Sequence, residues 1–543
     1  MKIKNTTIQN KTKQSRLNNE HIIPTHCIKN IETNEFLKSL LKYSETKENI
    51  LFSIGCELVR GNKNPNLKKF LGEYTFSKIT INDIPKNEFD LLGSAYQFLN
   101  SKIENLEKGL FYTGYKIAYD FVCDLDFNSG QLLLDPSCGS GSFLFNSNAK
   151  PNQIFGVDND PIAVMIAKFN YFIKFPDADY PNIFCDDFFN WISKNNKNKF
   201  NYIIGNPPYG ANLDLSNIKS SDIKSGESFS YFIESGIKLL KENGILRFLL
   251  PESILNVKRH SDIRNFILNK TNLKQIKKYK TRFSGVMSDL YMLEIDINKN
   301  NENLLFTVDK TIIIPKSIFK GLKNSVFTYF TEQDISIISK VKHKQGYTMI
   351  DSIFGLGVVT GDNQKLLFNS PIDESEQIYT GKEVTKYKLL NPNKHIVFNR
   401  DVLQQVAPNE IYRAPQKLVY KTINKHIKIA MDNTGSLTTN SANIFIPNID
   451  GLDIHTVMGL LNSELYSYLN LKLFGGVNKV SKENLQSLPL PKVSNEENEH
   501  IKNLVLLIIE NGDDNELQKY INKNIFGLTE EEIKYINNYN LNN

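Results

Sequence analysis

Short apolar runs, each ending in a polar side chain, recur along residues 131–206 and predict the buried strands of a parallel α/β sheet. Open α/β sheets bind ligands beyond the carboxyl ends of their strands, so the polar residues found there form the candidate site. The runs and the residues that end them are 131–134 with Asp135, 153–157 with Asp158, 182–185 with Asp186, and 202–204 with Asn206.

The apolar pattern changes on both sides of this region and predicts further domains. Upstream, Phe89, Leu92, Tyr96 and Leu99 follow helical spacing. Beyond about residue 340, short apolar runs alternate with glycine-containing turns, which is typical of an α+β domain. We expect a basic, disordered arm over residues 1–30, a helical preface over 31–105, a Rossmann-like α/β domain over 106–335 and an α+β domain over 336–543.

A nucleotide-type loop follows the first predicted strand and opens a helix. Gly139 and Gly141 allow its backbone to approach a ligand closely, as in dinucleotide-binding folds. The third glycine of that pattern is replaced by Leu144, which disfavours a hydride-transferring enzyme. Asp158 follows about 20 residues later, where an acid in such folds binds the ribose hydroxyls. Taken singly, each of these aspartates is more typical of a helix N-cap.

The tetrapeptide Asn206, Pro207, Pro208 and Tyr209 is suited to hold a conjugated amine for methylation. The Asn206 side-chain oxygen and the Pro207 carbonyl can each accept one N–H, which frees the nitrogen lone pair. The two prolines fix the backbone before a substrate arrives, and Tyr209 offers a ring on which a base can stack. A proline turn with a capping asparagine is the plain alternative.

These motifs, in this order, resemble the amino-methyltransferases that use S-adenosylmethionine. The resemblance is strongest to the γ-class N6-adenine DNA methyltransferases of restriction-modification systems, which flip the target adenine out of duplex DNA. It implies a catalytic domain with a C-terminal target-recognition domain, with Asn206 to Tyr209 as the catalytic motif. It leaves open whether Asp186 or Asp187 contacts the cofactor adenine. The implied cofactor-binding residues are Phe111, Tyr112, Thr113, Asp135, Pro136, Gly139, Gly141, Asp158, Asn159, Asp186, Asp187 and Phe188.

The resemblance also bears on two further positions, Phe283 and Gly114. Phe283, in the segment 282–286, corresponds to an aromatic residue that packs on the flipped base opposite Tyr209. Gly114 stands where the family usually has proline, which leaves the shape of that loop open.

Composition and charge agree with an enzyme that acts on nucleic acid. The net charge is +6, yet residues 379–430 hold ten Lys or Arg against three acids, a local excess of seven. Together with Tyr387, Tyr412 and Tyr420, this is typical of a phosphate-contacting surface, although a solvated lysine face has the same composition. The expected DNA contacts are Lys382, Lys386, Arg413, Lys417, Lys421, Lys425 and Lys428.

The remaining composition limits the surroundings of the protein. Five cysteines without a C-x-x-C pair indicate reduced thiols in a cytoplasm, with neither a disulfide framework nor a metal site. The longest apolar run, 504–509, is far shorter than a membrane span, and no signal peptide is evident. We expect a cytoplasmic monomer that binds double-stranded DNA and S-adenosylmethionine, with a cognate restriction endonuclease encoded nearby.

Other functions share parts of this pattern. A glutamine N5-methyltransferase uses the same tetrapeptide, but such enzymes are smaller and lack a basic C-terminal domain. An RNA methyltransferase or an N4-cytosine DNA methyltransferase also presents a conjugated amine, and Asn206 favours adenine over cytosine. No nuclease motif supports a fused restriction enzyme, and the catalytic motifs argue against a purely binding specificity subunit.

Overall fold

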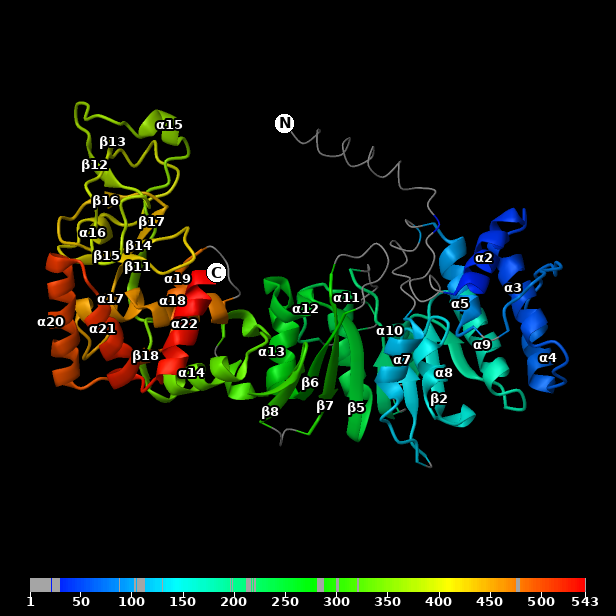
Figure 1. The fold of residues 1–543 in the computed structure, drawn as a ribbon. Helices are drawn as coiled ribbons and strands as arrows, with labels where there is room; N and C mark the ends of the chain where they lie inside the picture. Colours follow the sequence, from blue (N-terminus) through cyan, green and yellow to red (C-terminus); the bar gives the residue numbers. More distant parts are fainter. Residues whose placement is uncertain are drawn as a thin grey trace. The chain divides into compact units, whose positions relative to one another are not determined.

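The chain forms two compact units, Met1–Lys316 and Ser317–Asn543, which are described separately (Figure 1). The boundary expected after residue 335 falls inside helix α14, Glu332–His343, and the structure divides after Lys316. The computed structural model describes residues 21, 30–86, 88–101, 104, 113–128, 130–195, 197, 199–210, 216, 218, 221–280, 288–298, 302–319, 322–474 and 479–542.

Within the described part of unit 1, nine strands form one sheet in the order β3-β2-β1-β4-β5-β7-β6-β8-β9. The strands from β3 to β5 are parallel, and β7 runs antiparallel between β5 and β6. All four predicted strands are present. The bounds are β1 Leu133–Asp135, β2 Ile154–Asp158, β3 Asn182–Cys185, β4 Phe200–Gly205, β5 Leu240–Pro251, β6 Asn272–Tyr279, β7 Leu290–Asp296, β8 Asn303–Thr307 and β9 Thr311–Pro315.

Helices connect the parallel strands, as right-handed βαβ crossovers require. They bury apolar residues against the sheet, for example along α9, which begins at the N-cap Asp160 with a proline in its first turn. The bounds are α7 Tyr115–Val122, α8 Ser142–Asn146, α9 Pro161–Lys174, α10 Phe188–Asn195, α11 Ser228–Leu239, α12 Ser253–Asn256 and α13 Ser261–Lys270.

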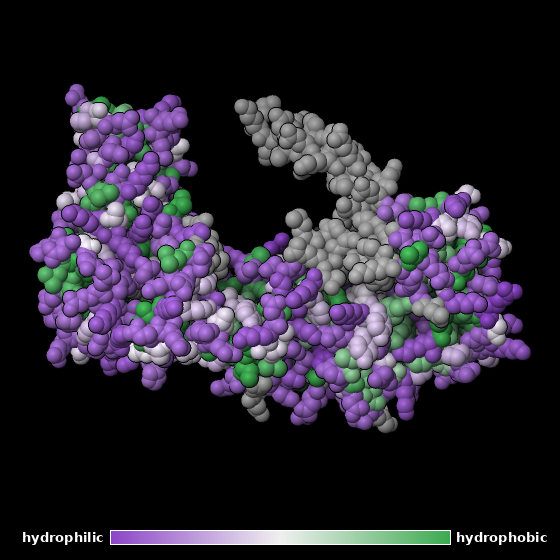
Figure 2. All heavy atoms as spheres, viewed as in Figure 1, coloured by the Kyte–Doolittle hydropathy of each residue, from purple (hydrophilic) through white to green (hydrophobic). Residues whose placement is uncertain are grey.

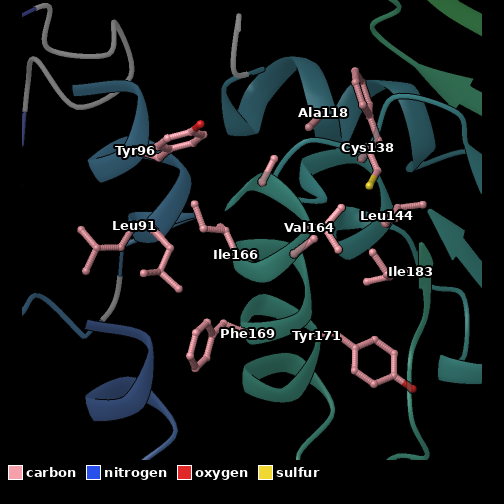
Figure 3. Close-up of a cluster of buried hydrophobic side chains, with 14 of the residues drawn as sticks. Leu91, Tyr96, Ala118, Cys138, Leu144, Val164, Ile166, Phe169, Tyr171 and Ile183 are labelled. Atoms are coloured by element: carbon pink, nitrogen blue, oxygen red, sulfur yellow. The ribbon is translucent and has the colours of Figure 1, made fainter. Parts of the chain in front are cut away.

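The predicted helical preface is present and shares one apolar core with the sheet and its helices. Figure 3 shows Leu91 and Tyr96 of α5 opposite Ile166 and Phe169 of α9. The helices α3 and α9 approach so closely that a Cβ on Gly55 would lie 2.6 Å from the ring of Phe169. The preface helices are α2 Ile31–Ser39, α3 Lys47–Leu58, α4 Pro65–Leu71 and α5 Leu91–Leu99.

Unit 2 is the predicted α+β domain. Its described strands form small sheets, β11-β17-β14-β15, β13-β12-β16 and β10-β18. The strands are β10 Gln345–Tyr347, β11 Ile353–Gly355, β12 Glu376–Tyr379, β13 Lys394–Ile396, β14 Lys417–Lys421, β15 Ile429–Asp432, β16 Leu437–Thr438, β17 Ala442–Ile446 and β18 Leu490–Pro491. The helices besides α14 are α15 Asn363–Leu366, α16 Asn409–Tyr412, α17 Ile454–Asn462, α18 Glu464–Leu473, α19 Lys482–Ser487, α20 Asn495–Asn511, α21 Asn515–Tyr520 and α22 Glu530–Asn542.

A buried ion pair joins β14 to β15. Lys417 and Asp432 are paired residues of the antiparallel ladder, and their side chains are 0% and 1% exposed. The Lys417 ammonium lies 2.5 Å from the Asp432 carboxylate and also donates to the Tyr412 carbonyl oxygen at 2.6 Å. Burial lowers the pKa of Lys417, and the hydrogen bond to Asp432 counteracts that shift. The pair therefore joins the two strands of the hairpin, and removing either residue would leave the other charge buried without its partner.

Lys417→Ala should lower the free energy of unfolding of unit 2 by about 3–5 kcal/mol, because it leaves the Asp432 carboxylate buried without its cation. The matched control is Arg413→Ala, which breaks a partly exposed pair with Glu376 and should cost less than about 1 kcal/mol. Urea denaturation of the full chain, followed by circular dichroism, measures both. Trp191, the single tryptophan, reports on unit 1 and should show an unchanged fluorescence transition. Equal losses in the two variants would contradict the buried-pair account.

Candidate functional site

The carboxyl ends of β1, β2 and β4 bring the first predicted site residues together. Strand β1 pairs in parallel with β2 on one side and with β4 on the other. Its last residue, Asp135, lies against Gly205 at the end of β4, where an added Cβ would stand 2.5 Å from Asp135 Oδ1. Only glycine fits between this carboxylate and the strand that leads into Asn206. The sequence patterns did not identify this role of Gly205, and the only signal for it is its position directly before Asn206.

Asp135 is fully buried and only half satisfied. Its Oδ1 accepts the Ser137 N–H at 3.1 Å, whereas Oδ2 has no hydrogen-bond partner in the part of the chain that the structure describes. Burial raises the pKa of Asp135 well above its usual range, and the neighbouring Asp158 adds to the shift. An unpaired buried carboxylate oxygen is costly unless a ligand supplies a donor or a positive charge.

The glycine-rich loop turns sharply around Asp158. Gly139 and Gly141 have φ values of 51° and 88°, a region that favours glycine. The Gly139 N–H donates to Asp158 Oδ2 at 2.8 Å, and the Asp160 N–H donates to Oδ1 at 2.9 Å. Burial raises the pKa of Asp158 to about 6 despite these two donors. Each carboxylate oxygen keeps a second lone pair, so the group can still accept a pair of hydroxyls.

The acids after β3 differ in what they already bind. Asp186 accepts from Asn190 at 2.7 Å and from the Lys194 ammonium at 3.0 Å, one donor on each oxygen. Asp187 uses Oδ1 to cap α10, accepting from the N–H groups of Phe189 and Asn190. Phe188 is 3% exposed, and its ring stacks on Phe232 at 5.0 Å between centroids.

The tetrapeptide predicted to be catalytic, Asn206 to Tyr209, follows β4 without a break. The Tyr209 hydroxyl lies within hydrogen-bonding distance of two acceptors, Asn206 Oδ1 and the Leu249 carbonyl oxygen, the latter 2.8 Å away. Its single proton can go to only one of them at a time. Ser137 donates to the Asn206 carbonyl at 3.2 Å, and Ser228 donates to the Pro208 carbonyl. These bonds fix the backbone of the motif to the glycine-rich loop and to α11.

Some predicted residues lie outside the described part of the chain. Phe111, Tyr112 and Phe283 are among them, whereas Thr113 is described and is 4% exposed. Gly114 is the N-cap of α7 with φ −64° and ψ 154°, which are angles that proline also adopts. Glycine therefore preserves here the backbone shape that the usual proline would impose.

Some residues of unit 2 that were predicted to form a phosphate-contacting surface are buried. Lys417 is buried in its pair with Asp432, so the prediction that it touches phosphate is wrong. The tyrosines interleaved with the lysines are core residues, since Tyr387, Tyr412 and Tyr420 are each 5% exposed or less. The charge count cannot distinguish residues that face the core from residues that face the solvent.

The other basic residues of the predicted surface fall into two groups. Lys386 pairs with Glu464 at 2.7 Å, and Arg413 makes two hydrogen bonds to Glu376. Lys425 and Lys382 are exposed, and Lys421 and Lys428 are partly exposed beside the turn between β14 and β15. The face of unit 2 visible in Figure 2 is mostly hydrophilic.

In the described residues, no group of three His, Cys, Asp or Glu side chains is placed to hold a metal ion. None of the described helices is both long and apolar enough to cross a membrane.

The strand order, with β7 antiparallel between β5 and β6, agrees with the Rossmann-like α/β core that the sequence predicts. Residues 152–283 match the Eco57I restriction-modification methylase family, and residues 376–490 match the TaqI-like C-terminal specificity domain. The chain thus resembles the methyltransferases of restriction-modification systems, and the resemblance drawn from the sequence is confirmed. The predicted cofactor, S-adenosylmethionine, agrees with these matches.

Two type II methyltransferases and one solved enzyme are similar to this chain. The type II methyltransferase M.VspI of Vibrio sp. (strain 343) is 25% identical over 357 residues, covering 61% of this chain and 85% of that protein. The type II methyltransferase M.HincII of Haemophilus influenzae is 21% identical over 394 residues, covering 63% and 74%. The solved type IIL restriction-modification enzyme MmeI in complex with DNA is 12% identical with a TM-score of 0.44, covering 93% and 88%.

Affinity for S-adenosylmethionine should fall as the pH drops below about 6, by up to tenfold per pH unit for each acid that must be ionised. Burial raises the Asp158 pKa to about 6, and the ribose hydroxyls that the sequence assigns to this acid would donate to its ionised form, so protonation should oppose binding. Asp135 titrates in the same sense. Calorimetry between pH 5 and 8 measures the affinity. In Asp158→Asn, the part of the decrease in affinity at low pH that comes from protonation of Asp158 should be absent. Tighter binding at low pH would contradict the assignment.

Proposed function

We propose that this protein is a site-specific DNA methyltransferase that transfers a methyl group from S-adenosylmethionine to N6 of adenine, as the modification enzyme of a restriction-modification system. The observation that carries the proposal is the adjacency of two sites at the ends of β1 and β4. Asp135, a buried acid with an unpaired oxygen, lies against Gly205, and the amine-binding motif begins at the next residue.

The residues present fit the cofactor. S-adenosylmethionine supplies an electrophilic methyl group on a sulfonium when bound. Asp158 would accept the ribose hydroxyls, and Asp135 Oδ2 would take the ammonium group of the methionine end, which would stabilise its ionised form. Between the two acids after β3, we assign the adenine amino group to Asp187, because its Oδ2 accepts no hydrogen bond within the described residues, whereas the Lys194 ammonium already pairs with Asp186. Phe188 would bound the adenine site from the start of α10.

Asn206 and Pro207 would hold the target amine. The Pro207 carbonyl has no hydrogen bond recorded among the described residues, which leaves it available to one N–H. The second N–H would replace the Tyr209 hydroxyl at Asn206 Oδ1, and the hydroxyl proton would go to the Leu249 carbonyl. Tyr209 then keeps an acceptor while its ring stacks on the extruded base, which offsets part of the few kcal/mol that flipping costs. Phe283 is proposed for the opposite face.

The alternative amino-methyltransferases differ in whether they require a specificity domain such as unit 2. A glutamine N5-methyltransferase has no use for a domain of this kind, and the match of residues 376–490 to a specificity domain favours DNA. An N4-cytosine or RNA amino-methyltransferase would use the same acceptors. Adenine is preferred because Asn206 begins the motif.

DNA contacts are proposed for the exposed cations of unit 2. Lys421, Lys425 and Lys428 stand together near the turn that joins β14 to β15, and Lys382 is a separate exposed cation. Lysines in such a position bind phosphates and orient the protein, whereas contacts to base edges specify the sequence.

Purified protein, incubated with labelled S-adenosylmethionine and duplex DNA in a buffer that contains a chelator, should yield labelled N6-methyladenine at one recognition sequence. Digestion to nucleosides and chromatography identify the product. Label found only in RNA or protein, or recovered as N4-methylcytosine, would overturn the proposal.

Asn206→Ala should lower kcat by about 10² or more while S-adenosylmethionine affinity stays within about threefold, because one acceptor of the reacting amine is removed. The matched variant is Asp158→Ala, which should lose cofactor affinity. Single-turnover kinetics and calorimetry separate the two effects. If Asn206→Ala fails to bind the cofactor and Asp158→Ala binds it normally, the assigned roles are reversed.

Replacing Lys421, Lys425 and Lys428 by alanine should weaken binding to all DNA sequences and reduce the salt dependence by about one unit for each phosphate that is no longer neutralised. Sequence preference should survive. A control that removes the same charge elsewhere in unit 2, Lys492, Lys519 and Lys534 to alanine, should leave the slope unchanged. A salt titration of DNA affinity compares the three proteins. An unchanged slope in the first variant would show that its lysines do not face the DNA.

A further inference from the structure

The carboxylate of Asp158 is held by two backbone N–H groups that belong to different loops. Gly139 lies in the loop after β1, and Asp160 lies in the loop after β2. The direction in which Asp158 presents its free lone pairs therefore depends on both loops being in place. Neither loop is fixed by the sheet alone, because both lie beyond the strand ends.

The loop after β1 is tied to the helical preface through Asp90. The Asp90 carboxylate accepts from the hydroxyl of Ser140, which is the residue after Gly139, and from Ser142 at 3.1 Å. It also accepts from Asn170 at 2.8 Å, and the same Asn170 amide donates to the Ser140 carbonyl at 2.9 Å. Ser140 is thus held by its side chain and by its backbone.

Asp90 reaches this position at a conformational cost. Its φ of 47° and ψ of 51° are left-handed, which L side chains rarely adopt. As the N-cap of α5 it also accepts the Gly93 N–H at 3.0 Å, and a Cβ on Gly93 would collide with its carboxylate. Four donors converge on one side chain, which compensates for the strained backbone.

The loop after β2 is tied to the same helix through Tyr96. The Tyr96 hydroxyl donates to Asp160 Oδ2 at 2.6 Å, while Asp160 Oδ1 caps α9. The Tyr96 side chain is fully buried, on the part of α5 that faces α9 in Figure 3. Asp90 and Tyr96, at the start and middle of one helix, therefore each anchor one of the two loops that orient Asp158.

We propose that Asp90 and Tyr96 are positioning residues for the cofactor, through which the preface helix α5 sets the orientation of Asp158. This inference rests on the proposed function, because it assigns the ribose of S-adenosylmethionine to Asp158. The preface then belongs to the cofactor site and is more than a cover for the sheet.

Tyr96→Phe is the main test, because it removes one hydroxyl without changing charge or ring volume. S-adenosylmethionine affinity should fall about tenfold, since one hydrogen bond to a charged group is removed. The value of kcat at saturating cofactor should stay within about twofold. Asp90→Asn should have a similar effect. The matched control is Tyr412→Phe, which removes a buried hydroxyl bonded to the Leu356 carbonyl in unit 2 and should leave cofactor affinity unchanged.

The pH dependence of cofactor affinity distinguishes positioning from a loss of stability. The N–H groups of Gly139 and Asp160 lower the pKa of Asp158, so loosening the loop should move the acid limb to higher pH in Tyr96→Phe. The titratable groups facing Asp158 are Asp135, Asp160, Cys138, Cys185 and Tyr96 itself. All except the tyrosine hydroxyl are retained in the variant. If Tyr96 had a purely structural role, Tyr96→Phe would lower the melting temperature, and cofactor affinity would decrease over the same pH range as in the wild type.

Wild-type affinity and an unmoved limb in both variants would overturn the inference while leaving the proposed function intact. An equal loss of affinity in Tyr412→Phe would also overturn it, because the effect would then be general destabilisation. A wild-type protein that does not bind S-adenosylmethionine would overturn the proposed function and this inference together.

Discussion

Parallel pairing of β1 with β2 on one side and β4 on the other is the constraint on which the site depends. Parallel strands end at the same edge of a sheet, so this pairing places Asp135, Asp158 and Asn206 at one edge although they are up to 71 positions apart in sequence. Gly205 then lets the Asp135 carboxylate lie directly against the backbone of β4. The sheet thereby brings the acids proposed for the cofactor next to the acceptors proposed for the target amine.

The same geometry leaves two buried acids whose ionised forms the described residues stabilise only in part. Asp135 is buried with one oxygen unpaired among the described residues, and burial raises the pKa of both Asp135 and Asp158. A ligand with an ammonium group and a pair of hydroxyls would satisfy both carboxylates. Buried acids that await a partner are typical of binding sites, where local stability is given up for recognition.

The sequence predicted the parts of the site that local patterns encode. The strand ends, the glycine turn and the Asn-Pro-Pro-Tyr motif depend on short-range rules of strand length and backbone freedom, and all are present at their predicted positions. What local patterns could not predict are contacts between distant residues. The bond from Tyr209 to Leu249 and the bracing of Ser140 by Asp90 join segments 40 and 50 residues apart. The prediction that Lys417 lies on the surface was wrong, because its side chain is buried in an ion pair with Asp432 on the neighbouring strand. A count of charges along the sequence cannot detect such a pair.

The central claim is that Asn206 and Pro207, at the end of β4, hold the N6 amine of adenine in DNA while S-adenosylmethionine supplies the methyl group. Base-modification sequencing of DNA from a host that expresses the protein tests it most directly. The account predicts N6-methyladenine at a single recognition sequence in cells with the wild-type protein, and none at that sequence with Asn206→Ala produced at the same level. Genomic DNA without a modified sequence, or a modification that persists in Asn206→Ala, would contradict it.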